Sequence, residues 1–102
     1  MPTSPIEHQR AAAETVHISA DTLTVDLTDG RSIAVPIEWY PRLATGTVAE
    51  RINWRFVGRG EGIHWPDLDE DISVENLLSG VRSGESQRSF QQWLQSRAPA
   101  TQ

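Results

Sequence analysis

A chain of 102 residues with 37% hydrophobic and 23% charged side chains has room for one globular domain, and this length argues against a deep cleft between two lobes. It contains no cysteine, which excludes disulfides, thiolate nucleophiles and cysteine-ligated metal sites. The net charge of −5 argues against a duplex-binding surface over the whole domain. No membrane-length apolar run or secretory signal is present, so we expect a cytoplasmic protein.

The first ordered element is expected near Thr15. The preceding arm, residues 1–14, mixes Pro, Ser, Gln and Ala without apolar periodicity and is expected to be mobile. In residues 16–19 and 23–27, apolar and polar side chains alternate, which is the pattern of half-buried strands. The intervening residues 20–21 predict a turn.

The position of the next turn follows from the strand register that each possible loop length would impose. A two-residue loop at Asp29 and Gly30 would mix apolar and polar side chains on both faces of the hairpin. A three-residue loop, residues 28–30, instead gathers the aliphatic side chains on one face and puts Gly30 in the left-handed position of a bulge turn. The resulting pairs are Val25 with Ile33 and Leu23 with Val35. The sequence therefore predicts an antiparallel meander whose apolar face packs on another part of the domain.

A short helix is expected between the meander and the next strands. Thr47 and Glu50 fit a capping box, in which the cap contributes about 1 kcal/mol. Val48 and Ile52 then lie one turn apart. We expect this helix to be the lid of the meander.

A β-hairpin and a second short helix are expected next. The strands are residues 54–57 and 63–65, with the glycine-rich turn 58–62 between them. Ser73 is placed to cap the following helix, and Gly80 is placed to end it. The domain is expected to occupy residues 15–82.

Residues 83–102 are expected to form a linker and a short C-terminal helix with a frayed end. Its apolar stripe comprises Phe90, Trp93, Leu94 and Arg97 at helical spacing. A helix this short is not stable alone, so it docks on its own domain, docks on a partner or stays largely unfolded, and we favour docking. The predicted fold is thus α+β: a three-stranded antiparallel β-meander, a short helix, a β-hairpin, a short helix and a C-terminal helix.

No spacing of residues demands catalysis, a metal or a cofactor. The glycines at 58, 60 and 62 continue into a strand, whereas phosphate-binding loops open a helix. The alternating carboxylates after Asp67 lack the glycine and the bidentate glutamate of a calcium loop. The three histidines show no convergent spacing. We predict no catalytic residue, metal ligand or cofactor, and activity centred on His64 and Asp67 is the least favoured hypothesis.

Charge is distributed unevenly along the chain. All nine basic residues are Arg, the side chain suited to bidentate pairing with carboxylates. Four lie in the middle of the chain with only Glu50 opposing them: Arg42, Arg51, Arg55 and Arg59. Residues 60–81 hold six acidic residues and no basic one. These clusters are solvated faces, internal ion pairs or interaction surfaces.

Two kinds of binding surface are therefore candidates. For a protein partner, the candidate residues are Trp39, Tyr40, Arg42, Asp67, Asp69, Glu70, Asp71 and Trp93. For a nucleic acid, the candidates are Arg42, Arg51, Arg55 and Arg59, with Trp39 or Tyr40 stacking on bases.

Six stretches of the sequence carry a family resemblance. They are Asp29 to Arg31, Val35-Pro36, Trp39 to Leu43, Glu50-Arg51, Asn53-Trp54 and Gly62 to Ser73. Over about residues 16–81, they are similar to the bacterial DUF2442 domain, a small α+β family without assigned activity. The resemblance implies a gene placed beside that of a small partner protein, as in a toxin and antitoxin pair. Some members continue into a helix-turn-helix, for which the tail after Gly80 is too short.

The expected function is that of a non-enzymatic protein-binding module, and the resemblance implies an antitoxin-like component that neutralises a small basic protein. The acidic segment would steer the partner. The alternative is a small nucleic-acid-binding or transcription-regulating domain that uses the Arg/Trp-rich central segment. No membrane partner is expected, and the chain is expected to be a monomer or a homodimer.

Overall fold

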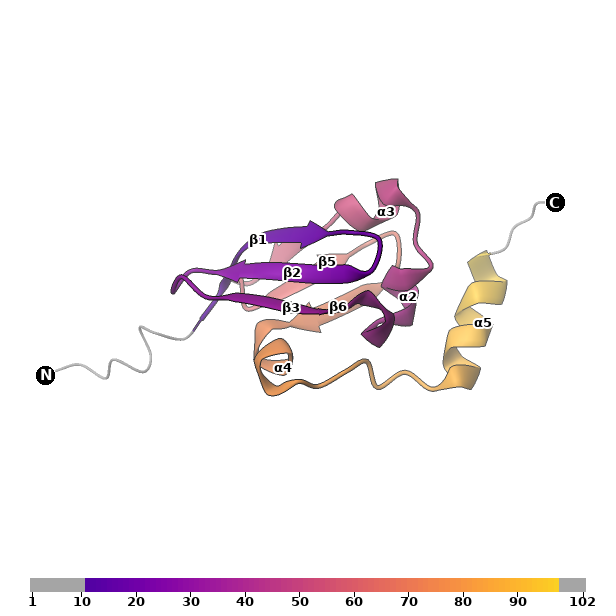
Figure 1. The fold of residues 1–102 in the computed structure, drawn as a ribbon. Helices are drawn as coiled ribbons and strands as arrows, with labels where there is room; N and C mark the ends of the chain where they lie inside the picture. Colours follow the sequence, from indigo (N-terminus) through magenta and orange to yellow (C-terminus); the bar gives the residue numbers. More distant parts are fainter. Residues whose placement is uncertain (1–10, 98–102) are drawn as a thin grey trace, which may run out of the picture.

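Two three-stranded antiparallel sheets form the domain in the computed structural model, which describes residues 11–97 (Figure 1). The first sheet is the meander of β1 (Ala13–Ile18), β2 (Thr22–Leu27) and β3 (Ser32–Pro36). The second is formed by β4 (Arg55–Val57), β5 (Gly62–Trp65) and β6 (Glu70–Ser73). The predicted α+β class is confirmed.

The predicted register of the meander is also confirmed. Val25 lies opposite Ile33, and Leu23 lies opposite Val35. Gly30 has a φ of 97°, a left-handed conformation that glycine adopts without steric cost. Leu23 and Val25 are fully buried, so this face of the meander lies against the core.

β1 begins at Ala13, two residues before the expected start of order. Ala13 is buried, and its backbone N–H donates to the carbonyl oxygen of Gly60 at 2.7 Å, which ties the first sheet to the turn between β4 and β5. The rest of the predicted arm, residues 1–10, lies outside the described residues, as does the predicted frayed end at 98–102.

The helices are short and connect or flank the sheets. They are η1 (Ile37–Trp39), α2 (Pro41–Ala44), α3 (Val48–Ile52), α4 (Val74–Ser79) and α5 (Gln87–Arg97). The capping box of Thr47 and Glu50 is present, Ser73 caps α4, and Gly80 ends it in a left-handed conformation. Within residues 11–97, no helix has the length and apolar character needed to cross a bilayer.

The prediction that α3 covers the meander is wrong. Val48 and Ile52 are 75% and 68% exposed, and no residue of α3 is buried. The second sheet takes that place, because Ile63, Trp65 and other apolar residues of its inner face join those of the meander in one core. A helix of five residues buries less apolar surface than such a sheet.

The predicted hairpin is two strands of this second sheet, and β6 was not anticipated. Ile72 on β6 pairs with Ile63 on β5 and is buried, whereas Asp71 faces outward. The run of three acidic residues that precedes Ile72, Asp69 to Asp71, hides this alternation in the sequence. With β6 in place, Glu70 lies on the inner face of the sheet beside Trp65.

Candidate functional site

The connection between β5 and β6 presents carboxylates to solvent. We call residues 66–71, which comprise this connection and the first two residues of β6, the acidic loop. Asp67 is exposed, and the side chains of Asp69 and Asp71 are 80% and 69% exposed. Asp69 has a φ of 51°, which turns the chain sharply at this residue. The side chains of Asp67, Asp69 and Asp71 therefore lie at the surface.

Two arginines hold the backbone of the acidic loop from its inner side. Arg42 Nη1 donates to the carbonyl oxygen of Asp69 at 3.0 Å, and Arg97 Nη1 donates to that of Asp67 at 3.1 Å. Arg42 comes from α2, whereas Arg97 comes from the last turn of α5. The conformation of the loop is thus set by two elements that lie far from it in sequence.

The same arginines dock α5 on the domain, beside α2 (Figure 1). The guanidinium groups of Arg42 and Arg97 lie 4.8 and 4.6 Å from the centre of the Trp93 ring. Arg42 Nε also donates to both carboxylate oxygens of Glu85, at 2.9 and 3.1 Å, and Arg97 pairs with Glu50. Cation–π contacts and ion pairs therefore carry the docking that the sequence favoured.

Glu70 is the one acidic-loop carboxyl that points inward. Its Oε1 accepts a hydrogen bond from the backbone N–H of Asp71 at 3.1 Å, and its Oε2 is buried without a hydrogen-bond partner among the described residues. Burial raises the pKa of Glu70 to about 7, against the lowering effects of that N–H and of Arg42. Glu70 is therefore not placed to contact a partner.

The three aromatic residues predicted to contact a partner make contacts inside the fold. Tyr40 is buried, and its hydroxyl donates to the carbonyl oxygen of Val81 at 3.1 Å. Trp39 is half-buried with the guanidinium of Arg82 at 4.7 Å over its ring. Trp93, a residue of α5, packs against the core. These three side chains hold the segment after α4 against the domain.

The four central arginines do not form one basic patch. Arg51 donates to the carbonyl oxygens of Leu43 and Ala44, at 2.9 and 2.7 Å, and Arg42 is engaged as described above. Arg55 and Arg59 are exposed on β4 and on the turn that follows it. Two of the four arginines predicted to contact a nucleic acid, Arg42 and Arg51, therefore bind groups of the domain itself.

Each of the two histidines within residues 11–97 pairs with one carboxylate. His64 Nδ1 lies 2.7 Å from Asp71 Oδ1, and His17 Nε2 lies 3.3 Å from Asp26 Oδ2. The carboxylate of Asp67 accepts instead from the side-chain amide of Asn53 at 2.9 Å, so His64 and Asp67 do not form the pair considered from the sequence. No cluster of three potential metal-ligating side chains occurs among residues 11–97.

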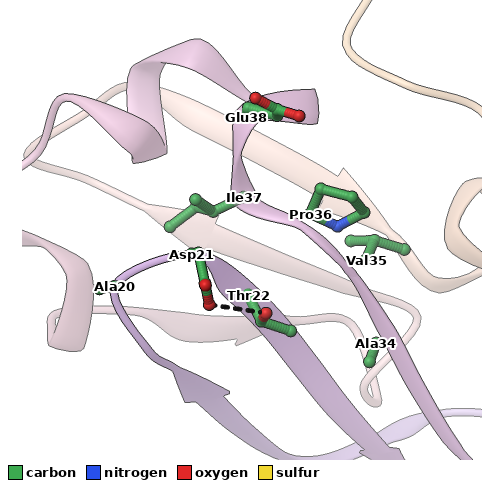
Figure 2. Close-up of a pocket in the computed structure, with 8 residues that line it drawn as sticks. All are labelled: Ala20, Asp21, Thr22, Ala34, Val35, Pro36, Ile37 and Glu38. Atoms are coloured by element: carbon green, nitrogen blue, oxygen red, sulfur yellow. Dashed lines mark hydrogen bonds between the residues drawn. The ribbon is translucent and has the colours of Figure 1, made fainter.

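A surface hollow lies beside the meander, where the β1–β2 turn faces the end of β3 (Figure 2). Its titratable side chains are Asp21 and Glu38. The carboxylate of Asp21 accepts from Thr22 Oγ1 at 2.9 Å, within its own turn. This hollow presents no pair of side chains placed for acid–base chemistry.

Comparison with known proteins gives a family match and similar solved structures. The family described as "Protein of unknown function (DUF2442)" matches residues 13–83, a span that ends before α5. No curated protein matches the sequence. The crystal structure of a protein of unknown function from Rhodospirillum rubrum is similar, with a TM-score of 0.64 and 25% identity over 76% of this chain and 95% of that one. The solution structure of an uncharacterized protein from Chromobacterium violaceum has a TM-score of 0.65 and 17% identity over 95% of this chain and 85% of that one.

Sequence reasoning did not identify Arg97, Glu50 and Glu85 as parts of this site. The sequence indicated Glu50 as a capping residue and as the one acidic residue among the central arginines, and Arg97 as the end of an apolar stripe. Arg97 and Glu50 are 47 residues apart in the sequence, and Glu85 is 43 residues from its partner Arg42. No local pattern reports contacts over such separations.

Proposed function

The chain belongs to the DUF2442 family, and we propose that it acts as a non-enzymatic protein-binding module whose acidic loop recognises a small basic protein. The observation that carries this proposal is the orientation of the loop, in which Asp67, Asp69 and Asp71 are exposed while Arg42 and Arg97 bind the backbone carbonyls of Asp69 and Asp67. An antitoxin-like role, in which the chain neutralises that partner, is the specific form that the family resemblance suggests.

Preorganisation supports the proposal energetically. A loop that is ordered before binding loses less conformational entropy when the partner arrives, so more of the interaction energy appears as affinity. Three exposed carboxylates on a chain of net charge −5 also attract a basic protein over a distance of about one Debye length, roughly 8 Å at physiological salt. The loop thus supports both rapid association and a defined register.

Comparative co-purification from the native host tests the proposal. The full chain is compared with the triple variant Asp67→Asn, Asp69→Asn, Asp71→Asn and with a control variant that removes three other exposed charges, Glu14→Gln, Glu38→Gln, Glu75→Gln. We expect a basic protein to be retained by the wild type and the control and lost from the loop variant. Equal retention by all three proteins would remove the acidic loop as the binding surface.

One specific observation favours a nucleic-acid-binding function. Arg55 and Arg59 are exposed on and beside the edge strand β4, and no carboxylate of residues 11–97 forms an ion pair with either. Two arginines supply only a small part of the phosphate contacts that duplex binders use. This alternative predicts binding to single strands that weakens steeply with salt and is lost in Arg55→Gln, Arg59→Gln. A flat salt titration removes it.

A further inference from the structure

The guanidinium of Arg42 connects the acidic loop with the docked α5. It donates to both oxygens of the Glu85 carboxylate, to the Asp69 carbonyl oxygen, and lies over the Trp93 ring. The side chains of Arg42 and Glu85 are only 16% and 11% exposed, so their pair is shielded from much of the solvent. Loss of this pair would therefore affect the helix and the loop together.

Glu70 follows Asp69, whose carbonyl oxygen accepts from Arg42, and it lines one hollow with Ser83 and Gly84, the two residues before Glu85. The charges of both Arg42 and Glu85 are close enough to affect the pKa of Glu70, the first lowering it and the second raising it. The other titratable groups around Glu70 and Arg42 are the Tyr40 hydroxyl, Asp71, Arg82 from the segment after α4, and the Asp69 carboxylate, which lies 3.5 Å from Arg42 Nη1. The uncharged polar residues Ser73, Asn76 and Ser83 line the same hollow. The buried Oε2 has no hydrogen-bond partner among the described residues, so a charged Glu70 lacks a satisfied environment in this arrangement.

We infer that Glu70 and Glu85 form a proton-controlled latch in which they compete for Arg42 and thereby release or hold α5. When Glu70 is protonated, it is neutral, and Arg42 remains with Glu85. When Glu70 loses its proton, it repels Glu85 and attracts Arg42. Because Ser89 on the first turn of α5 donates to Glu85 at 2.9 Å, release of Glu85 loosens that turn.

The latch also affects the acidic loop, since the arginines that dock α5 are those that fix the Asp67 and Asp69 carbonyls. Release of α5 withdraws Arg97 from Asp67 and redirects Arg42. We therefore expect the loop to be better ordered below about pH 7 than above it, the midpoint following the titration of Glu70. Only the consequence for a bound partner rests on the proposed function.

The test is an NMR titration of the full chain without any partner, so its outcome does not depend on whether the proposed function holds. The Glu70 side-chain carboxyl carbon reports its protonation, and backbone ¹⁵N relaxation of α5 reports docking. We expect α5 to move with the domain at about pH 5.5 and independently at about pH 8.5, with the same midpoint as Glu70. A helix whose relaxation does not change, or changes with a different midpoint, overturns the latch.

Variants sharpen the test. Glu70→Gln should leave α5 docked across the whole pH range, whereas Glu85→Gln should weaken docking at both ends of it. The control Glu75→Gln removes an exposed carboxylate of α4 and should keep the wild-type transition. A transition that persists in Glu70→Gln overturns the proposal. If Glu70→Gln does not fold, the comparison of midpoints in the wild type decides alone.

Discussion

Arg97 near the end of the chain donates hydrogen bonds to both carboxylate oxygens of Glu50, at 2.9 and 3.0 Å. The same carboxylate accepts from the backbone N–H of Thr47 at 2.9 Å and so completes the capping box of α3. The Thr47 N–H and Arg97 together hold the pKa of Glu50 below its usual range. One side chain thus joins the start of α3 to the docking of α5.

This shared role predicts a difference between two substitutions. Glu50→Ala removes the ion pair and the hydrogen bond from the Thr47 N–H to the Glu50 carboxylate, but it keeps the hydrogen bond from the residue 50 N–H to the Thr47 hydroxyl. We expect a loss of about 1–2 kcal/mol in the free energy of unfolding and release of α5. Thr47→Ala removes only the cap and should cost about 1 kcal/mol while α5 stays docked. Urea denaturation and amide hydrogen exchange of α5 measure the two effects. Equal exchange in both variants would contradict the joint role of Glu50.

Trp93 predicts how far α5 depends on cation–π contacts. In Trp93→Ala, the guanidinium groups of Arg42 and Arg97 lose the ring they contact, and we expect the exchange protection of α5 amides to fall about tenfold. Amides of β2 in the core of the meander should keep their protection. The exposed Gln91→Ala on the same helix is the control and should leave α5 unchanged. Unaltered protection in Trp93→Ala would show that the helix docks by other contacts.

The raised pKa of Glu70 predicts a pH-dependent cost to stability. Between the ordinary value of 4.5 and about 7, the folded protein retains a proton that the unfolded chain has lost, so the free energy of unfolding falls as pH rises through this range. The stability that protonated Glu70 contributes is complete below about pH 4.5 and is lost above about pH 7. Solvent access to the site limits the loss to about 1–2 kcal/mol.

Glu70→Gln removes this titration. Relative to wild type, we expect the variant to be more stable by about 1–2 kcal/mol at about pH 8 and closely matched at about pH 4.5, because other titrating groups cancel in the difference. Urea denaturation at both pH values gives the comparison. A difference that is independent of pH would show that Glu70 does not titrate in this range.

The meander could be predicted because its information is local. The two-residue period of the aliphatic side chains selects one register, and Gly30 supplies the only loop conformation that fits it. The caps at Thr47 and Ser73 and the termination at Gly80 are equally local, and each is confirmed.

The candidate site could be predicted only in part, because its contacts are long-range. The acidic segment was found from composition, but the three carboxylates that precede Ile72 obscured both β6 and the inward direction of Glu70. Several aromatic and basic residues that suggested a partner instead contact each other inside the fold. The docking of α5, for example, brings Trp93 to Arg42, which is 51 positions away in the sequence. Only tertiary structure distinguishes such internal pairs from an exposed surface.

Isothermal titration of the purified partner against the full chain tests the central claim most directly. The account predicts that the triple variant Asp67→Asn, Asp69→Asn, Asp71→Asn raises Kd by at least about tenfold, while the charge-matched Glu14→Gln, Glu38→Gln, Glu75→Gln variant changes it by less than about threefold. Raising salt from about 0.05 M to about 0.5 M should weaken the wild type and largely remove its advantage over the triple variant. Equal Kd values for the triple variant and the wild type at low salt would contradict recognition through the acidic loop.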